Sequence, residues 1–134
     1  MKLAKVKKNC RTVFIVEDSL YMRALIKMAL HKSGYVIVGE SGTGKESIEL
    51  ITALRPDLVT LDINLPDMSG VDVLFEVRKH NVASHILVVS NVNEKNILKK
   101  MEVLGAMGYV RKPFESKNLV SAVSRVFSEY YVME

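Results

Sequence analysis

Short β-branched runs alternate along this chain with segments of helical spacing, and this alternation constrains the fold more than any other feature. The runs are apolar almost throughout, as expected of strands covered on both faces. They span Thr12–Val16, Tyr35–Gly39, Leu58–Leu61, Ile86–Val89 and Tyr109–Arg111. One strand begins about every 25 residues, near the ~30 residues of a βαβ unit. Five such units predict an α/β fold with a parallel sheet covered by helices on both faces.

Apolar residues at helical spacing fill the segments between these strands. The predicted helices cover Met22–Leu30, Lys45–Leu54, Val71–His80, Ile97–Leu104 and Leu119–Tyr130. Capping and breaking residues agree with these segments. Ser19 is placed to cap the first helix, Gly34 to end it, Pro56 to stop the second, and Gly105 and Gly108 to close the fourth.

The composition fits one folded domain and separates the excess positive charge from it. The 134 residues are 49% apolar, so a domain of this size can bury a core without disulfides or a structural metal. The formal net charge is +4, but five of the 19 basic residues lie among the first eleven residues, where no residue is acidic. Residues 12–134 keep 14 basic against 15 acidic residues. We therefore predict a basic N-terminal arm over residues 1–11 and one domain over residues 12–134.

Neither the arm nor the domain has the features of a nucleic-acid or membrane protein. No aromatic residue is interleaved with the lysines of the arm, which favours a solvated chain end over a nucleic-acid contact. The apolar runs are far shorter than the roughly 18 residues that a membrane span needs. A single cysteine, Cys10, cannot form an internal disulfide, which fits a reducing compartment. The sequence thus predicts a soluble, cytoplasmic protein that does not bind nucleic acid directly.

Polar residues gather at the ends of the predicted strands. In sheets of this kind, ligands bind beside the carboxyl ends of the strands. Three carboxylates, one hydroxyl and two cations stand there: Glu17-Asp18 after the first strand, Asp62 after the third, Ser90 after the fourth and Arg111-Lys112 at the end of the fifth. Neighbouring carboxylates repel one another unless a cation neutralises them, and Mg2+ prefers oxygen ligands. We therefore expect an Mg2+ site at this edge of the sheet.

The same residues suit phosphoryl transfer, a reaction that needs little besides positioning and charge neutralisation. Lys112 supplies a positive charge for a phosphoryl group, and Ser90 supplies a hydroxyl donor. Asp62 lies at the centre of the edge, and an ionised carboxylate needs no base to act as a nucleophile. Asp62 is therefore the predicted phosphoacceptor.

The sequence resembles the receiver domain of bacterial two-component response regulators from residue 12 to about residue 131. The resemblance is carried by Glu17-Asp18-Ser19, by the stretch DINLPDMSG at residues 62–70, by Ser90, and by the stretch YVRKPF at residues 109–114. Each motif is weak alone, but their order and their places at strand ends make the match specific. The resemblance implies a doubly wound, flavodoxin-like (βα)5 receiver fold, whose five parallel strands have the order 2-1-3-4-5.

The resemblance also implies a role for each acidic residue. Asp62 would accept a phosphoryl group from a histidine kinase, a phosphotransfer protein or a small phosphodonor. Asp18 and Asp62 would bind Mg2+ directly, Glu17 would bind it through water, and Asn64 through its backbone carbonyl. Lys112 would form an ion pair with the phosphoryl group.

The resemblance further implies how phosphorylation reaches a partner. Ser90 would move towards the phosphoryl group, and Tyr109 would fill the space near it. This change would alter the face formed by the fourth helix, fifth strand and fifth helix, which would bind a downstream protein. The Lys112–Pro113 peptide bond would be cis. Asn91 departs from the alanine of many members, and its polar side chain can change access to the phosphoacceptor.

Two alternatives to this interpretation stay open. The segment Gly39–Lys45 fits the Gly-x4-Gly-Lys pattern of a nucleotide-binding P-loop and lies between a predicted strand and a predicted helix. Against this alternative, Glu46 stands where a Ser or Thr hydroxyl should bind Mg2+. The second alternative is a receiver-like module that binds partners without phosphorylation. A phosphatase with an aspartyl nucleophile is disfavoured, because Asn64 stands where it would need a second acid.

The sequence as a whole predicts a stand-alone receiver. The last predicted helix ends about three residues before Glu134, which leaves no room for an output domain. We therefore expect a phosphorylation-operated signalling domain of the chemotaxis or phosphorelay type. It would not be a classical enzyme, because it would catalyse only its own phosphorylation and dephosphorylation.

Overall fold

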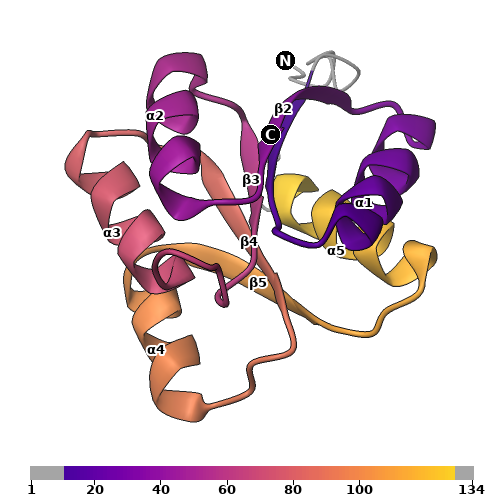
Figure 1. Cartoon of the computed structure of the whole chain (residues 1–134). Helices are drawn as coiled ribbons and strands as arrows, with labels where there is room; N and C mark the ends of the chain where they lie inside the picture. Colours follow the sequence, from indigo (N-terminus) through magenta and orange to yellow (C-terminus); the bar gives the residue numbers. More distant parts are fainter. Residues whose placement is uncertain (1–10, 129–134) are drawn as a thin grey trace, which may run out of the picture.

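A computed structural model describes residues 11–128, and it contains five strands and five helices in strict alternation (Figure 1). The strands are β1 (Thr12–Val16), β2 (Val36–Ser41), β3 (Leu58–Leu61), β4 (His85–Ser90) and β5 (Ala106–Arg111). The helices are α1 (Leu20–Lys32), α2 (Gly44–Leu54), α3 (Gly70–Lys79), α4 (Lys95–Val103) and α5 (Ser116–Ser128). The lysines of the basic arm and the predicted end of the last helix at Tyr130 lie outside the described residues. Over residues 11–128, every helix is too short or too polar to cross a membrane.

The five strands form one parallel sheet in the order β2-β1-β3-β4-β5. This topology confirms the doubly wound α/β fold and the strand order that the resemblance implied. Helices α1 and α5 cover one face of the sheet, and α2, α3 and α4 cover the other (Figure 1). The strand order reverses between β1 and β3, so a ligand site is expected at the carboxyl ends of these two central strands.

Two apolar clusters, one on each face of the sheet, form the core. Successive side chains of a strand point to opposite faces, so Val13 and Ile15 of β1 join the cluster under α1 and α5. Phe14 and Val16 join the cluster under the other three helices. All four side chains are at most 1% exposed, which explains why β1 is apolar at every position after Thr12.

The helices that follow β1, β2 and β3 begin at capping side chains. The Ser19 hydroxyl accepts a hydrogen bond from the Met22 amide at 3.2 Å, as the sequence predicted for the first helix. Thr43 caps α2 in the same way. Ser69 and Asp72 form a reciprocal capping box at the start of α3. These caps fix where the chain turns from strand to helix at the carboxyl edge of the sheet.

Two predicted boundaries differ from the structure around α4 and β5. The helix ends at Val103, and Gly105, whose φ is +98°, leads the chain out of it. The sequence predicted that Gly108 would close the helix, but this residue lies inside β5. The strand begins at Ala106, three residues earlier than expected. The segment Ala106–Gly108 has no β-branched residue, and its pairing with β4 makes it a strand.

Arg11, which the sequence grouped with the basic arm, packs against the domain. Its side chain is buried, and its guanidinium carbon lies 4.2 Å from the centre of the Phe127 ring. The same ring stacks on Tyr35 and meets His85 edge-on, each with ring centres 5.8 Å apart. A cation over an aromatic face is attracted to it, so Arg11 ties the entry of β1 to the end of α5.

Candidate phosphoacceptor and metal site

The carboxyl ends of the two central strands bring three acidic side chains together. Val16 of β1 is paired with Leu61 of β3, so the residues that follow each strand are neighbours. The structure places carboxylate oxygens of Glu17, Asp18 and Asp62 within 4.8 Å of one another. Glu17 and Asp62 are 1% and 4% exposed, whereas Asp18 is exposed. The cluster therefore has a buried floor and one side open to solvent, and its oxygens can hold a divalent cation.

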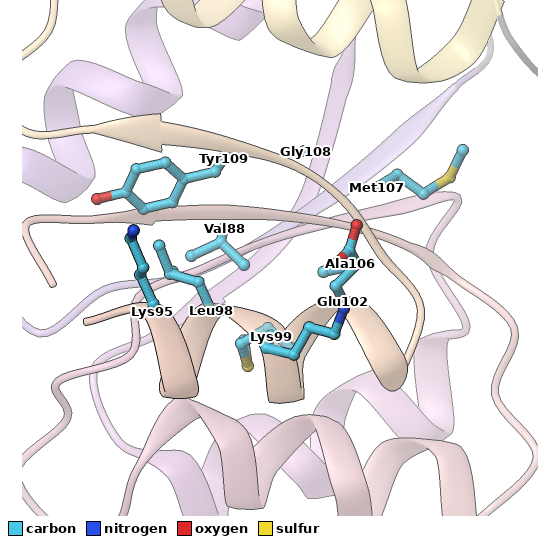
Figure 2. A pocket seen from close by; sticks show the side chains of 10 residues that line it. Val88, Lys95, Leu98, Lys99, Glu102, Ala106, Met107, Gly108 and Tyr109 are labelled. Atoms are coloured by element: carbon cyan, nitrogen blue, oxygen red, sulfur yellow. The ribbon is translucent and has the colours of Figure 1, made fainter. Parts of the chain in front are cut away.

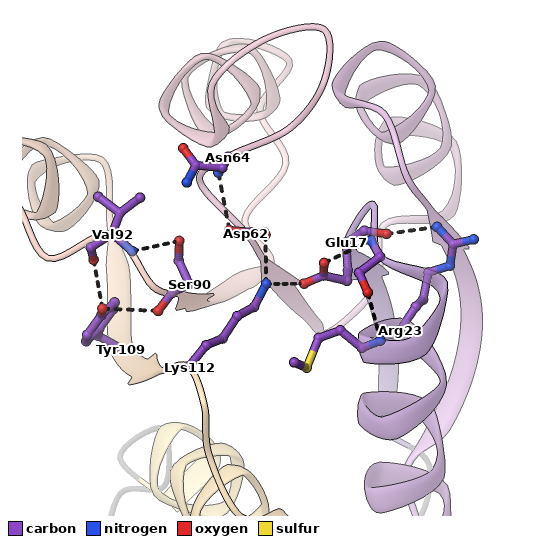
Figure 3. A network of polar contacts seen from close by, with 10 residues as sticks. Glu17, Arg23, Asp62, Asn64, Ser90, Val92, Tyr109 and Lys112 are labelled. Carbon is purple, nitrogen blue, oxygen red and sulfur yellow. Dashed lines mark hydrogen bonds and ion pairs between the residues drawn. The ribbon is translucent and has the colours of Figure 1, made fainter.

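Lys112 lies between the two buried carboxylates (Figure 3). Its ammonium Nζ donates to Glu17 Oε1 at 2.7 Å and to Asp62 Oδ2 at 2.9 Å. The residue follows β5, and its amide donates to the carbonyl of Ser90 at the end of β4. The Lys112–Pro113 peptide bond is cis, as the resemblance implied. Residues from the ends of β1, β3 and β5 thus lie together, and β4 joins them through the backbone carbonyl of Ser90.

The charges at this site are unequal, because one half-buried cation, Lys112, faces the two buried carboxylates of Glu17 and Asp62. Burial raises the pKa of Glu17, although the hydrogen bonds from Lys112 and from the Ser19 amide oppose this effect. Burial lowers the pKa of Lys112, but its hydrogen bonds to Glu17 and Asp62, together with their charges, outweigh burial and raise this pKa overall. Both shifts favour an added positive charge at the site.

Backbone amides orient the free oxygens of the buried carboxylates. Ser19 N donates to Glu17 Oε2 at 3.0 Å, and Asn64 N donates to Asp62 Oδ1 at 3.2 Å. Gly70 lies directly behind Asp62, where an added Cβ would lie 2.4 Å from the Asp62 carbonyl oxygen. Both oxygens of Asp62 therefore have fixed partners, and the backbone behind it leaves no room for a larger residue.

The two predicted switch residues lie on the β4–β5 side of the site (Figure 3). Ser90 is completely buried, and its hydroxyl accepts a hydrogen bond from the Val92 amide at 3.3 Å rather than contacting Asp62. The Tyr109 hydroxyl lies 3.1 Å from the carbonyl oxygen of Ser90 and 2.7 Å from that of Val92. Asn91, which lies between Ser90 and Val92 in the sequence, is exposed. Ser90 and Tyr109 thus both form hydrogen bonds with the backbone of residues 90–92.

Sequence reasoning missed Arg23, which supports the acidic cluster from α1. Its guanidinium donates to the carbonyl oxygen of Glu17 at 2.8 Å. Its Nε lies 2.9 Å from a carboxylate oxygen of Glu40 on β2, and Lys27 also pairs with Glu40. These ion pairs hold the pKa of Glu40 below its usual range, chiefly through the hydrogen bond from Lys27. No local pattern marks Arg23, because its partners come from two other elements.

The structure also bears on the P-loop alternative. The first two amides of α2, those of Gly44 and Lys45, donate to the carboxylate of Asp67 at 2.7 and 3.0 Å. Glu46 accepts a hydrogen bond from Ser41 at 2.7 Å. A carboxylate of the chain itself therefore takes the amides that would bind phosphate in a P-loop, and this arrangement disfavours nucleotide binding there.

The doubly wound sheet with five covering helices is the flavodoxin-like architecture of CheY-like receiver domains. The family model of the response regulator receiver domain matches residues 13–124. The chain therefore belongs to the response regulator receiver family, as the sequence resemblance indicated. Receiver domains are signalling domains rather than classical enzymes, and they interact with kinases and with target proteins.

The relatives of this chain include both a chemotaxis protein and a transcriptional regulatory protein. The chain is 34% identical over 116 residues to the chemotaxis protein CheY of Thermotoga maritima, a match that covers 87% of this chain and 97% of that protein. It is 33% identical over 120 residues to the transcriptional regulatory protein PdtaR of Mycobacterium tuberculosis, with 90% and 58% covered. The receiver domain of a putative LuxO repressor from Vibrio parahaemolyticus superimposes with a TM-score of 0.83 at 27% identity, covering 90% of this chain and 92% of that one. These likenesses support the family and leave the pathway open.

Proposed function

We propose that this chain is a phosphorylation-operated switch in which Asp62 accepts a phosphoryl group from a histidine kinase, a phosphotransfer protein or a small phosphodonor. The observation that carries this proposal is the buried Asp62 carboxylate, which lies 2.9 Å from Lys112 Nζ and beside the oxygens of Glu17 and Asp18. Family membership and this geometry support the same chemistry independently of each other.

The transfer itself requires an ionised carboxylate and balanced charge. An oxygen of Asp62 forms a bond to phosphorus while the bond from phosphorus to the donor breaks, and the bonding electron pair leaves with the donor. Mg2+ would be held directly by Asp18, by Asp62 and by the backbone carbonyl of Asn64. Glu17 would bind the ion through water. The ion supplies positive charge to the phosphoryl oxygens when it is bound. Lys112, which is already within the cluster, would remain as their ion-pair partner.

The switch would run from Ser90 to Tyr109. A phosphoryl group on Asp62 would offer the proton of the buried Ser90 hydroxyl a strong acceptor, whereas the Ser90 oxygen now accepts a hydrogen bond from the Val92 amide. A moved Ser90 leaves space beside Tyr109, whose hydroxyl bonds to carbonyls of the same segment. The resulting rearrangement would alter the face of α4, β5 and α5.

That face has the chemistry of a protein-binding surface. A pocket of about 380 Å³ lies between α4 and β5, and Tyr109 forms part of its wall (Figure 2). Its lining is apolar at Val88, Leu98 and Met101, among others. Lys95 and Lys99 against Glu102 leave its charged lining residues with a net positive charge. An apolar centre with basic neighbours suits a downstream protein that presents an acidic segment.

Acetyl phosphate with Mg2+ tests the phosphoacceptor directly. We expect intact-mass measurement to detect one added phosphoryl group on the wild-type protein and none on Asp62→Asn. Asp57→Asn is the matched control, because Asp57 precedes β3 at the opposite end of the sheet and contacts Thr12. This control should gain the group like the wild type.

Two results would contradict the proposal. A phosphoryl group that still appears on Asp62→Asn would assign the phosphoacceptor elsewhere. A wild-type protein that gains none from acetyl phosphate or from phosphorylated histidine donors would favour the module that binds partners without phosphorylation.

A further inference from the structure

The tip of the loop between β3 and α3 is bound to the first turn of α2. Asp67 uses both carboxylate oxygens there: Oδ1 accepts from Gly44 N at 2.7 Å, and Oδ2 accepts from Lys45 N at 3.0 Å. The opening amides of a helix lack partners within the helix and carry partial positive charge, so they favour an anion. The two hydrogen bonds hold the pKa of Asp67 below its usual value, the bond from Gly44 contributing most. The carboxylate is therefore ionised at neutral pH.

Packing fixes the same tip through the next residue. An added Cβ on Gly44 would lie 2.4 Å from Met68 Cγ and 2.8 Å from its Sδ, so Met68 packs where a larger residue would have its side chain. Met68 also contacts the apolar cluster beneath α2, α3 and α4. Two successive residues, one polar and one apolar, thus hold the loop against α2.

The base of this loop carries groups of the proposed site. Asn64 forms an isolated antiparallel bridge with Ser69, and the Gly70 amide donates to the Ile63 carbonyl at 2.7 Å. Only Leu65 and Pro66 separate the bridged Asn64 from the tip. A displacement of the tip therefore reaches the backbone of Asn64 through a short, closed loop.

We propose that Asp67 is a positioning residue for divalent-cation binding, because its attachment to the start of α2 holds the β3–α3 loop in the arrangement that presents the Asn64 carbonyl. This inference rests on the proposed function, in which that carbonyl is a ligand of Mg2+. It also gives the turn at Gly39–Lys45 a use, since the P-loop-like spacing provides amides for Asp67. The side chain is exposed and lies outside the apolar clusters, so its removal should affect cation binding more than global stability.

Calorimetric titration of the metal-free protein with MgCl2 tests this inference without any phosphorylation step. Asp67→Ala should raise the Mg2+ dissociation constant by at least about threefold, a modest effect for a group that acts on a ligand indirectly. Asp67→Asn keeps one oxygen acceptor and should lie between Asp67→Ala and the wild type. In amide exchange measured by NMR, Gly44 and Lys45 should lose protection in Asp67→Ala.

Asp72→Ala is the matched control, because it removes the same charge five residues along the chain. Asp72 accepts from the Ser69 amide in the capping box, and its carboxylate accepts no hydrogen bond from the opening amides of α2, which Asp67 takes. Its Mg2+ dissociation constant should change by less than about twofold. Urea unfolding of all variants separates a loss of stability from a loss of affinity, and Asp67→Asn carries the comparison if Asp67→Ala does not fold.

The outcomes separate this inference from the proposed function. If Asp67→Ala binds Mg2+ as tightly as the wild type does, the positioning role is refuted while the metal site stands. If the wild-type protein binds no Mg2+, the metal site and the inference fail together. Full protection of the Gly44 and Lys45 amides in Asp67→Ala would also overturn the inference, because the loop would then not depend on the carboxylate.

Discussion

Replacement of Gly70 by alanine should destabilise the fold at the point where it supports Asp62. The added Cβ would lie 2.4 Å from the carbonyl oxygen of Asp62 and 2.8 Å from the Cα of Ile63. Both contacts are with backbone, so no side-chain rotation relieves them. A normal contact needs a separation of about 3.4 Å, and the start of α3 would have to move by about 1 Å.

The size of the effect follows from three contributions. Overpacking in a well-packed region costs about 1–3 kcal/mol. A displaced Gly70 also weakens the 2.7 Å hydrogen bond from its amide to Ile63, which is worth about 1 kcal/mol. The lower backbone entropy of alanine in the unfolded chain returns about 0.4–1 kcal/mol. The net loss of unfolding free energy is therefore about 1–3.5 kcal/mol.

Urea unfolding followed by circular dichroism measures this loss, and Gly108→Ala provides the control. An added Cβ on Gly108 would lie 3.1 Å from a terminal methyl of Leu87, which can move, so this variant should lose less than about 1 kcal/mol. We also expect Gly70→Ala to react more slowly with acetyl phosphate, because the displaced backbone belongs to Asp62. A Gly70→Ala protein within about 0.5 kcal/mol of the wild type would refute the steric reasoning.

Two further predictions concern charged and titratable side chains. Lys112→Met leaves Glu17 and Asp62 buried without their cation and should cost about 2–3 kcal/mol at neutral pH, near the lower end of the range for broken buried pairs; added Mg2+ should restore part of the loss. Lys117→Met, which removes an exposed cation, should change the free energy of unfolding by less than about 0.5 kcal/mol in the same urea assay. Equal losses in Lys112→Met and Lys117→Met would contradict this reasoning. Burial, aided by the charges of nearby arginines, lowers the pKa of His85 below its usual 6.5. The unfolded chain therefore binds a proton at His85 more readily than the folded chain does, so the free energy of unfolding should fall as the pH drops through 6.5 towards the lowered pKa. NMR titration measures that pKa, and His85→Gln should remove this part of the pH dependence of unfolding.

The fold was largely predictable because its strands are marked locally. Each central strand is buried on both faces, so the apolar run alone identifies Thr12–Val16 and Leu58–Leu61, and the structure has these same bounds. The prediction was weaker where pairing decides the conformation. Ala106–Gly108 becomes strand through its contact with β4, and β2, at the edge of the sheet, extends two residues beyond the predicted end to Ser41.

The acidic cluster was predictable for a geometric reason, and its supports were not. Parallel strands bring their carboxyl ends to one edge, so residues that follow strands, such as Asp62, are recognisable from sequence order. Arg23 and Asp67 act on the same edge from helix and loop positions. Asp67 meets α2 across more than 20 residues of sequence, and no local pattern records such a contact.

The two pKa shifts at the site lead to one conclusion about its resting state. A raised pKa of Glu17 and a raised pKa of Lys112 both mean that the folded chain holds a proton at this edge more tightly than ordinary side chains do. Burial is the chief cause for Glu17, whereas the hydrogen bonds and charges of Glu17 and Asp62 raise the pKa of Lys112 against the effect of burial. The acidic cluster therefore lacks positive charge. A divalent cation beside the exposed Asp18 would supply more of this charge than a single proton does. A phosphoryl group would deepen the deficit, because it replaces a singly charged carboxylate with a group of higher negative charge. If Asp62 is the phosphoacceptor that we propose, we expect cation binding to accompany phosphoryl transfer, because Lys112 alone would leave negative charge on the product.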